Sequence, residues 1–146
     1  MEGRRKLSTS EIKVLCRDLL SKVCRERDNY TCYVTGQKCE PGVMAWQGQA
    51  AHLIPINRLP PELRYDPRVV KWMCGSAHSD FDGNTNYGKK SANQAFVWGK
   101  LAREEPELFE FLTTLPRQFD DKFTKADWEA QLYQLREEMG NESSTT

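Results

Sequence analysis

The chain has 146 residues, a length that fits one domain with a modest core and leaves little room for a second. Hydrophobic residues make up 38%, charged residues 29%, and the formal net charge is zero, which excludes a disordered chain. No apolar run approaches the roughly 20 residues of a bilayer span, and the charged start has no signal-peptide pattern. An odd count of five cysteines argues against a secreted disulfide framework, so we expect reduced thiols and a cytoplasmic location.

The charges are distributed unevenly along the sequence. Residues 1–27 carry eight Lys or Arg against four Asp or Glu, whereas residues 101–146 carry five against eleven. One interpretation is a basic front half that faces the phosphates of a nucleic acid, with an acidic rear. The other is that acidic and basic helices pair with and solubilise one another, and charge alone does not decide between the two.

An amphipathic helix is predicted over residues 9–27. Ser8 and Glu11 have the spacing of a capping box, which marks the start of a helix. Apolar residues then recur at helical intervals, at Ile12, Leu15, Cys16, Leu19 and Val23. Asp28 and Asn29 are expected to end the helix.

Three short strands are predicted between this helix and the middle of the chain. Their apolar runs cover residues 30–34, 50–54 and 69–73. Residues 37–48 contain glycine and proline without a clear period and predict a loop. The linker after the second strand contains Pro55, Pro60 and Pro61, which exclude a regular α-helix there.

The C-terminal part is predicted to be helical. Residues 91–103 form one helix that would pack against the strands, and Pro106 begins another that runs to about residue 115. Thr124 and Asp127 have capping-box spacing and precede a last helix, which Gly140 would end. Its apolar positions follow at spacings of four, three and four, at Trp128, Leu132, Leu135 and Met139.

The only two histidines of the chain, His52 and His78, are the candidate catalytic groups. Hydrolysis of a phosphodiester needs a base that deprotonates water and a hard cation that stabilises charge on the phosphate. Imidazole suits the base because its pKa lies close to physiological pH. Taken singly, His52 is better explained as a satisfied core residue and His78 as an exposed turn residue, so only the surrounding pattern favours chemistry.

That pattern is a series of short motifs in a fixed order. They are Arg27-Asp28, Cys32-Tyr33-Val34-Thr35-Gly36, Ala50-Ala51-His52, Pro61-Glu62-Leu63-Arg64-Tyr65, Cys74-Gly75-Ser76-Ala77-His78, Asp82-Gly83-Asn84 and Phe123-Thr124-Lys125-Ala126-Asp127. Together they cover about residues 20–139 and resemble the HNH (ββα-metal) endonucleases, most closely the phage NinG/Rap recombination nucleases. The resemblance implies an α+β fold in which a small ββα-metal finger has flanking helices.

The resemblance implies one nuclease domain over residues 1–146. Its expected parts are an N-terminal helix (9–27), a ββα-metal core (30–103), C-terminal helices (104–140) and a flexible tail (141–146). A phage protein of this kind would work in the host cytoplasm.

The resemblance also implies roles for individual residues. His52 would be the general base that activates the attacking water, and His78 would bind a single Mg²⁺ or Mn²⁺ ion. Asp80 or Asp82 would add an oxygen ligand, since Mg²⁺ is usually bound by one or two carboxylates plus waters. The basic side chains expected to contact DNA phosphates are Arg64, Arg68, Lys71, Lys89 and Lys90. Taken alone, each arginine is better explained as a solvated loop charge.

The sequence departs from the family at the structural zinc. The family holds this zinc with two Cys-x-x-Cys pairs, and here Thr35 and Ala77 replace the second member of each pair. Cys32 and Cys74 are the residual zinc positions. Because both losses fall on one site, we expect that the zinc itself was given up and that these cysteines are small buried apolar residues. The alternative is that Cys39 replaces a lost ligand.

Three functions remain open from the sequence. The first is a divalent-metal-dependent DNA endonuclease that acts on branched recombination intermediates. Such a protein would bind DNA and no membrane, and it would work either as a monomer or as a homodimer. The second is a catalytically degenerate HNH-fold protein that binds DNA or a protein partner. It is favoured by Ala51, where many family members have an acidic ligand, and by Val69, where many have a bracing Asn. The third is a zinc-binding interaction module.

Overall fold

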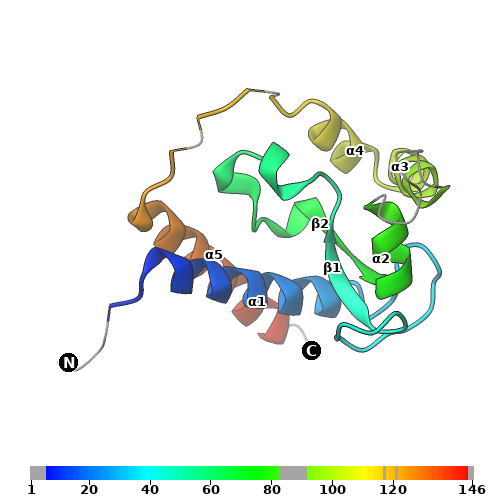
Figure 1. Cartoon of the computed structure of the whole chain (residues 1–146), viewed down its shortest axis with the longest axis horizontal. Helices are drawn as coiled ribbons and strands as arrows, with labels where there is room; N and C mark the ends of the chain where they lie inside the picture. Colours follow the sequence, from blue (N-terminus) through cyan, green and yellow to red (C-terminus); the bar gives the residue numbers. More distant parts are fainter. Residues whose placement is uncertain (1–5, 83–91, 117, 121, 145–146) are drawn as a thin grey trace.

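The computed structural model of the chain describes residues 6–82, 92–116, 118–120 and 122–144. Its elements in chain order are α1 (Thr9–Arg27), β1 (Gly48–His52), three 3-10 turns (Ile56–Arg58, Pro61–Leu63 and Pro67–Val69), β2 (Val70–Cys74), α2 (Gly75–Phe81), α3 (Ala92–Glu104), α4 (Pro106–Thr113) and α5 (Lys125–Ser144). The fold is a mixed α+β arrangement of helices around an antiparallel two-stranded sheet (Figure 1). Within these ranges, no helix has both the length and the apolar character that crossing a bilayer requires.

Helix α1 has the predicted bounds and start. The Ser8 hydroxyl accepts a hydrogen bond from the backbone N of Glu11 (3.1 Å), and the Glu11 carboxylate accepts one from the backbone N of Ser8 (2.9 Å). The helix lies beside α5 (Figure 1), so the two ends of the chain are packed together. The buried residues of this pair of helices are Ile12, Cys16, Leu20, Val23, Cys24, Trp128, Leu132 and Leu135.

Strands β1 and β2 form a buried antiparallel ribbon. His52 is opposite Val70 at one end of the ribbon, and Gly48 is opposite Cys74 at the other. All five residues of β2 are buried, whereas β1 is partly exposed. A side chain at position 48 would collide with the indole of Trp72, so glycine leaves room for that indole to lie against β1.

An ion pair attaches the end of α1 to β2. The Arg27 guanidinium contacts the Asp28 carboxylate at 2.8 Å and also donates to the backbone carbonyls of Pro67 (2.6 Å) and Val70 (2.7 Å). The Asp28 carboxylate accepts a hydrogen bond from the backbone N of Trp72 (2.9 Å). Burial alone would raise the pKa of Asp28, but its hydrogen bonds and the charge of Arg27 hold that pKa below its ordinary value. The Arg-Asp motif therefore has a structural role.

The strand predicted over residues 30–34 is wrong. Asn29 and Tyr30 have φ values of +53° and +57°, in the left-handed region, and the backbone N of Tyr30 donates to the carbonyl of Arg25. The chain therefore turns sharply after α1, and only an isolated bridge joins Thr31 to Lys38. The apolar residues that suggested a strand instead pack against the core from a turn.

The predicted end of the last helix is also wrong. Helix α5 continues through Gly140 to Ser144, so residues 141–144 of the predicted flexible tail are helical, and the last two residues lie outside the described chain. A glycine inside a helix costs only about 1 kcal/mol relative to alanine, which is too little to end a helix by itself.

Helix α2 was not predicted as a helix, yet it positions the candidate site. It packs against both strands and against α3, which in turn packs against α4. An ion pair between a buried lysine and a half-buried glutamate fixes the start of α4 to the ribbon, because Lys71 Nζ lies 2.8 and 2.9 Å from the two carboxylate oxygens of Glu105. The Tyr33 hydroxyl donates to the same carboxylate at 3.1 Å.

Candidate active site

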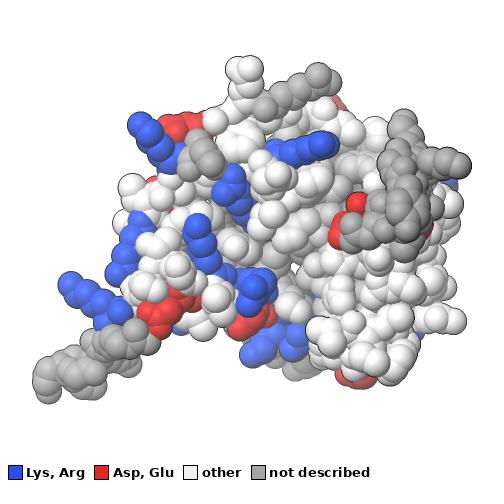
Figure 2. All heavy atoms as spheres, viewed as in Figure 1, with Lys and Arg blue, Asp and Glu red and all other residues white. Residues whose placement is uncertain are grey.

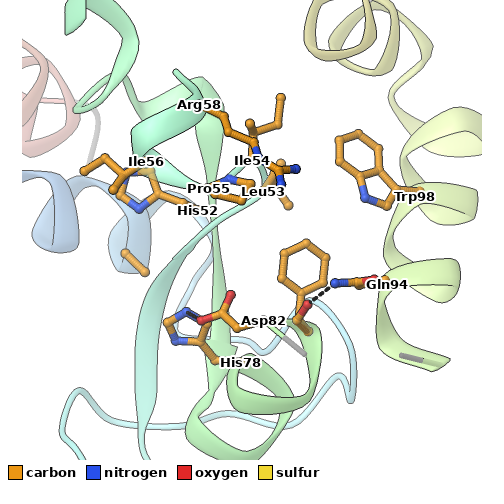
Figure 3. A pocket seen from close by; sticks show the side chains of 12 residues that line it. His52, Leu53, Ile54, Pro55, Ile56, Arg58, His78, Asp82, Gln94 and Trp98 are labelled. Atoms are coloured by element: carbon orange, nitrogen blue, oxygen red, sulfur yellow. Dashed lines mark hydrogen bonds and ion pairs between the residues drawn. The ribbon is translucent and has the colours of Figure 1, made fainter. Parts of the chain in front are cut away.

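Both histidines line one cleft between the ribbon, α2 and α3. His52 is the last residue of β1, and His78 lies in α2, which turns back along β1 so that His78 lies beside Gln49. The cleft has a volume of about 570 Å³, and its polar and aromatic lining includes His52, Arg58, His78, Asp82, Gln94 and Trp98. Figure 3 shows the two imidazoles on one wall and Trp98 on the other.

A hydrogen bond to a backbone carbonyl fixes the tautomer of the His52 imidazole. Its Nε2 atom lies 2.7 Å from the backbone carbonyl oxygen of Arg64. Because a carbonyl oxygen only accepts hydrogen bonds, Nε2 carries the proton, and in the neutral ring Nδ1 has a lone pair. Burial lowers the pKa of His52 below its ordinary value, and the nearby His78 lowers it further, although the Arg64 carbonyl and Asp82 oppose this. His52 is therefore neutral at pH 7 and can accept a proton at Nδ1.

The imidazole of His78 is oriented by a chain of two hydrogen bonds. The Gln49 amide donates from Nε2 to the backbone carbonyl of Gly42 at 3.2 Å, which directs its Oε1 atom to Nδ1 of His78 at 2.6 Å. Since Oε1 can only accept, Nδ1 of His78 carries a proton. The atom of this ring that faces away from Gln49 is Nε2.

The Nε2 atom of His78 lies 3.0 Å from Oδ2 of Asp82, one helical turn further along. Two atoms that both present lone pairs repel each other at this distance unless a proton or a cation lies between them. With Nδ1 already protonated, the pair is either an imidazolium beside a carboxylate or two ligand atoms that face a shared cation. The second state matches the preference of ligating histidines to donate their other N–H to an oxygen acceptor.

The donor set fits a hard divalent ion of the Mg²⁺ type. One imidazole and one carboxylate are the kind of incomplete protein shell that Mg²⁺ and Mn²⁺ complete with water and substrate phosphate. Over the described ranges, no group of three or more His, Cys, Asp or Glu side chains is arranged to hold a metal ion. Asp80, the other expected carboxylate ligand, instead accepts a hydrogen bond from the backbone N of Asn93 at 3.3 Å.

Arg64 and Arg68, two of the basic residues expected to contact phosphate, have partners within the protein. Arg64 contributes its carbonyl to His52, and its guanidinium donates to the carbonyl of Leu59 at 3.0 Å. Arg68 is ion-paired with Asp66 at 2.8 Å and lies over the Phe111 ring. The positions of Lys89 and Lys90 lie outside the described residues.

The expectation that Lys71 contacts phosphate is contradicted by its burial. Only 7% of this residue is exposed, and its ammonium group is already bound by Glu105. The sequence analysis missed Arg58, an exposed residue of the first 3-10 turn that lines the cleft. It also missed Gln94 and Trp98 of α3. No local pattern marks these three residues, because the linker and α3 meet the histidines only in the folded chain.

The two cysteines that were expected to be residual zinc positions lie close together in the core. Cys32 and Cys74 are buried, and the backbone N of Cys74 donates to the Cys32 sulfur at 3.3 Å. Thr35 donates its backbone N to the same sulfur at 3.4 Å. Cys39 is buried and hydrogen-bonds to the carbonyl of Gln37 through its sulfur. All five cysteines are free thiols in this structure.

Comparison with protein-family models, with curated proteins and with solved structures finds no match.

Proposed function

We propose that this chain is a divalent-metal-dependent DNA endonuclease of the HNH kind. The single observation that carries the proposal is the division of roles between two imidazoles in one cleft. His52 is neutral with a lone pair at Nδ1, and His78 directs Nε2 at the Asp82 carboxylate. One ring is thus suited to take a proton from water, and the other to bind a cation.

The order of the elements around the cleft supports the proposal. A histidine at the end of a first strand, a return strand and a short helix with a second histidine form a ββα unit, here β1, β2 and α2. The resemblance of the sequence to HNH nucleases implies this order. The hydrogen bonds of Arg27 and Asp28 to the backbone of β2 and of the turn before it fix the end of α1 against the ribbon.

In the proposed reaction His52 holds its proton at Nε2 against the Arg64 carbonyl and accepts the proton of the attacking water at Nδ1. Gln49 keeps His78 oriented toward Asp82. A divalent ion held by His78 and Asp82 would stabilise the negative charge that develops on the phosphate. Among the described residues that line the cleft, Arg58 is an exposed cation, and in this proposal it pairs with a phosphate of the strand.

The substrate in this proposal is DNA with a branch, as the NinG/Rap resemblance implies. In the face shown in Figure 2, many Lys and Arg side chains lie over α1 and the neighbouring 3-10 turns, with some Asp and Glu among them. Such a surface attracts the phosphate backbone without reading its sequence.

A second candidate function is favoured by one observation. His78 and Asp82 supply only two protein ligands, and the described residues offer no third. A degenerate member of the fold would bind DNA or a protein partner through the same surface without cutting it.

The experiment compares the full chain with His52→Ala on labelled forked and linear duplexes, in Mg²⁺, in Mn²⁺ and in EDTA. Loss of a general base lowers the rate by about 10²- to 10⁴-fold while DNA binding and the circular dichroism spectrum are retained. Glu129→Gln, an exposed change on α5, is the matched control and leaves the rate unchanged. A His52→Ala protein as active as the parent excludes this mechanism, and a parent that binds without cutting supports the degenerate alternative.

A further inference from the structure

The wall of the cleft opposite the two imidazoles carries an aromatic side chain to which the proposed reaction assigns no role. Trp98 of α3 lines the same cleft as His52, His78 and Asp82, and Figure 3 shows its ring across from the start of the proline-rich linker. Other apolar residues of the lining are Ile54, Pro55, Ile56 and Phe81. The cleft therefore has a polar part, where the candidate chemistry lies, and an apolar part that faces Trp98.

The indole of Trp98 is held in position by α4. It packs edge-to-face against the ring of Phe109, with the ring centroids 6.2 Å apart. The residue is half-buried, so part of its side chain stays open to the cleft. The flat surface of this ring is therefore fixed before any ligand binds.

Helix α3 is also fixed to the helix that carries His78. The Asn93 side chain donates from Nδ2 to the backbone carbonyl of Ala77 at 3.3 Å. The Gln94 side chain donates from Nε2 to the backbone carbonyl of Phe81 at 2.6 Å. These two acceptors lie on either side of His78 in the sequence of α2. Hydrogen bonds within the protein therefore set the width of the cleft between Trp98 and the candidate metal pair.

Two hydrogen-bond donors of the lining lack a partner in the part of the chain that the structure describes. The indole N–H of Trp98 has no acceptor there, whereas that of the buried Trp72 donates to the carbonyl of Cys39 at 3.0 Å. The exposed guanidinium of Arg58 has no carboxylate partner there either. Both donors are thus available to a molecule that enters the cleft.

These features together fit a molecule that has an anionic group and a flat ring. The volume of the cleft, about 570 Å³, lies within the range of about 300–1,000 Å³ that is usual for small-molecule sites. A cation held by His78 and Asp82 would attract the anion, and Trp98 would contact the ring. A nucleotide is such a molecule. A regular duplex covers both faces of each base, so the cleft favours an unpaired nucleotide.

We propose that Trp98 is a stacking platform for one unpaired nucleotide of the substrate, whose phosphate lies toward His78 and Asp82. Arg58 pairs with a neighbouring phosphate of the same strand. This inference rests on the proposed function, because it takes a phosphate of the strand to be bound at the candidate metal pair. Aromatic side chains stack on bases of any sequence. The platform gives a physical reason for a preference for branched DNA, since a branch supplies unpaired nucleotides and a linear duplex does not.

The test uses the full chain with His52→Ala in Mg²⁺, so that binding is measured without cleavage. The probes are a forked DNA with 2-aminopurine in the unpaired arm next to the branch, and a fully paired duplex of the same sequence. Trp98→Leu fills part of the space of the indole without its flat face. It raises the dissociation constant for the fork by about tenfold and removes the fluorescence change of 2-aminopurine, whereas the duplex constant stays the same. Trp98→Phe keeps an aromatic face and retains most of the fork affinity.

Phe96→Ala is the matched control, because Phe96 lies on the same helix, is 45% exposed and does not line the cleft. It leaves both constants unchanged, and thermal unfolding shows which variants are folded. An equal loss on fork and duplex with Trp98→Leu overturns the proposal, because Trp98 would then only pack against Phe109. An unchanged fork affinity in Trp98→Leu, or a loss in Trp98→Phe as large as in Trp98→Leu, also overturns it.

A second measurement needs no change at Trp98. In the His52→Ala protein, stacking quenches 2-aminopurine in the unpaired arm of the fork and not 2-aminopurine in the paired arm. Equal signals from the two positions, no signal from either, or absence of DNA binding overturns the proposal. In the last case the cleft would serve a ligand other than DNA.

The two proposals fail in different ways. If the parent protein never cuts DNA but its fork binding still depends on Trp98, the endonuclease is excluded and the stacking platform is supported. If the parent cuts the fork and Trp98→Leu leaves binding and cutting unchanged, the endonuclease is supported and the stacking platform is overturned.

Discussion

His52 and Arg64 are joined by a hydrogen bond of 2.7 Å between the imidazole Nε2 and a backbone carbonyl in the proline-rich linker. The bond connects the end of β1 to a segment twelve residues further along the chain, so the linker sets the orientation of the ring. The same bond leaves Nδ1 as the basic atom. The linker therefore belongs to the candidate active site, because its Arg64 carbonyl orients His52.

The lowered pKa of His52 has a consequence for pH dependence. Because burial lowers the pKa of His52 in the folded state, the histidine of the unfolded chain is protonated first, as the pH falls through about 6.5. The contribution of neutral His52 to the free energy of unfolding is therefore complete above that pH. It is lost as the pH falls from about 6.5 to the lower pKa of the folded state. Urea unfolding at pH 7.5 and pH 5.5 should show that the free energy of unfolding decreases less in His52→Gln than in the parent. Equal losses in the two proteins would contradict a depressed pKa.

The hydrogen-bond chain from Gly42 through Gln49 to His78 predicts an effect on metal affinity. Gln49→Leu removes both the acceptor for His78 Nδ1 and the donor to the Gly42 carbonyl. Loss of such an outer partner lowers metal affinity by about 10- to 100-fold, which calorimetric titration with Mn²⁺ measures. Gln134→Leu, on the exposed surface of α5, is the control and leaves the affinity unchanged. An unchanged affinity in Gln49→Leu would exclude His78 as a ligand.

The ion pair between Arg27 and Asp28 predicts a large difference between two similar substitutions. Asp28→Asn removes the counter-charge of Arg27, whose side chain is 31% exposed, and weakens the bond from the backbone N of Trp72, so we expect a loss of about 1–2 kcal/mol in the free energy of unfolding. Asp18→Asn removes an exposed partner of Arg17 at 3.9 Å and costs less than about 0.5 kcal/mol. Denaturant titrations of the two variants compare these losses, and similar values would refute a role for Asp28 in fastening β2.

The buried pair of Lys71 and Glu105 allows a rescue experiment. Glu105→Gln leaves a nearly buried ammonium group uncompensated and should destabilise the fold by about 2 kcal/mol, since Glu105 is itself partly exposed. Adding Lys71→Met removes the charge and should restore most of the lost stability. Thermal unfolding of the single and double variants tests this. A double variant less stable than Glu105→Gln would indicate that Lys71 stabilises the fold by other contacts.

Local patterns predicted where α1, α4 and α5 begin, because the start of a helix depends on nearby residues, but they missed α2 and the end of α5. The capping box at Ser8 and the paired bonds between Thr124 and Asp127 are set by residues three positions apart. The strands were less predictable. The run at 30–34 became a turn, and β1 begins two residues before the predicted start. Strand pairing depends on distant partners, which a local window does not contain.

The sequence by itself identified His52 and His78 as the candidate catalytic residues, and it fixed the spacing of the motifs around them. Only the tertiary structure decided which ring nitrogen each histidine presents, because Arg64 and Gln49 make that choice through contacts across the fold. It also decided that Lys71 is a buried partner of Glu105. Residue identity sets what a side chain can do, whereas burial and hydrogen-bond partners from distant segments set its protonation and accessibility.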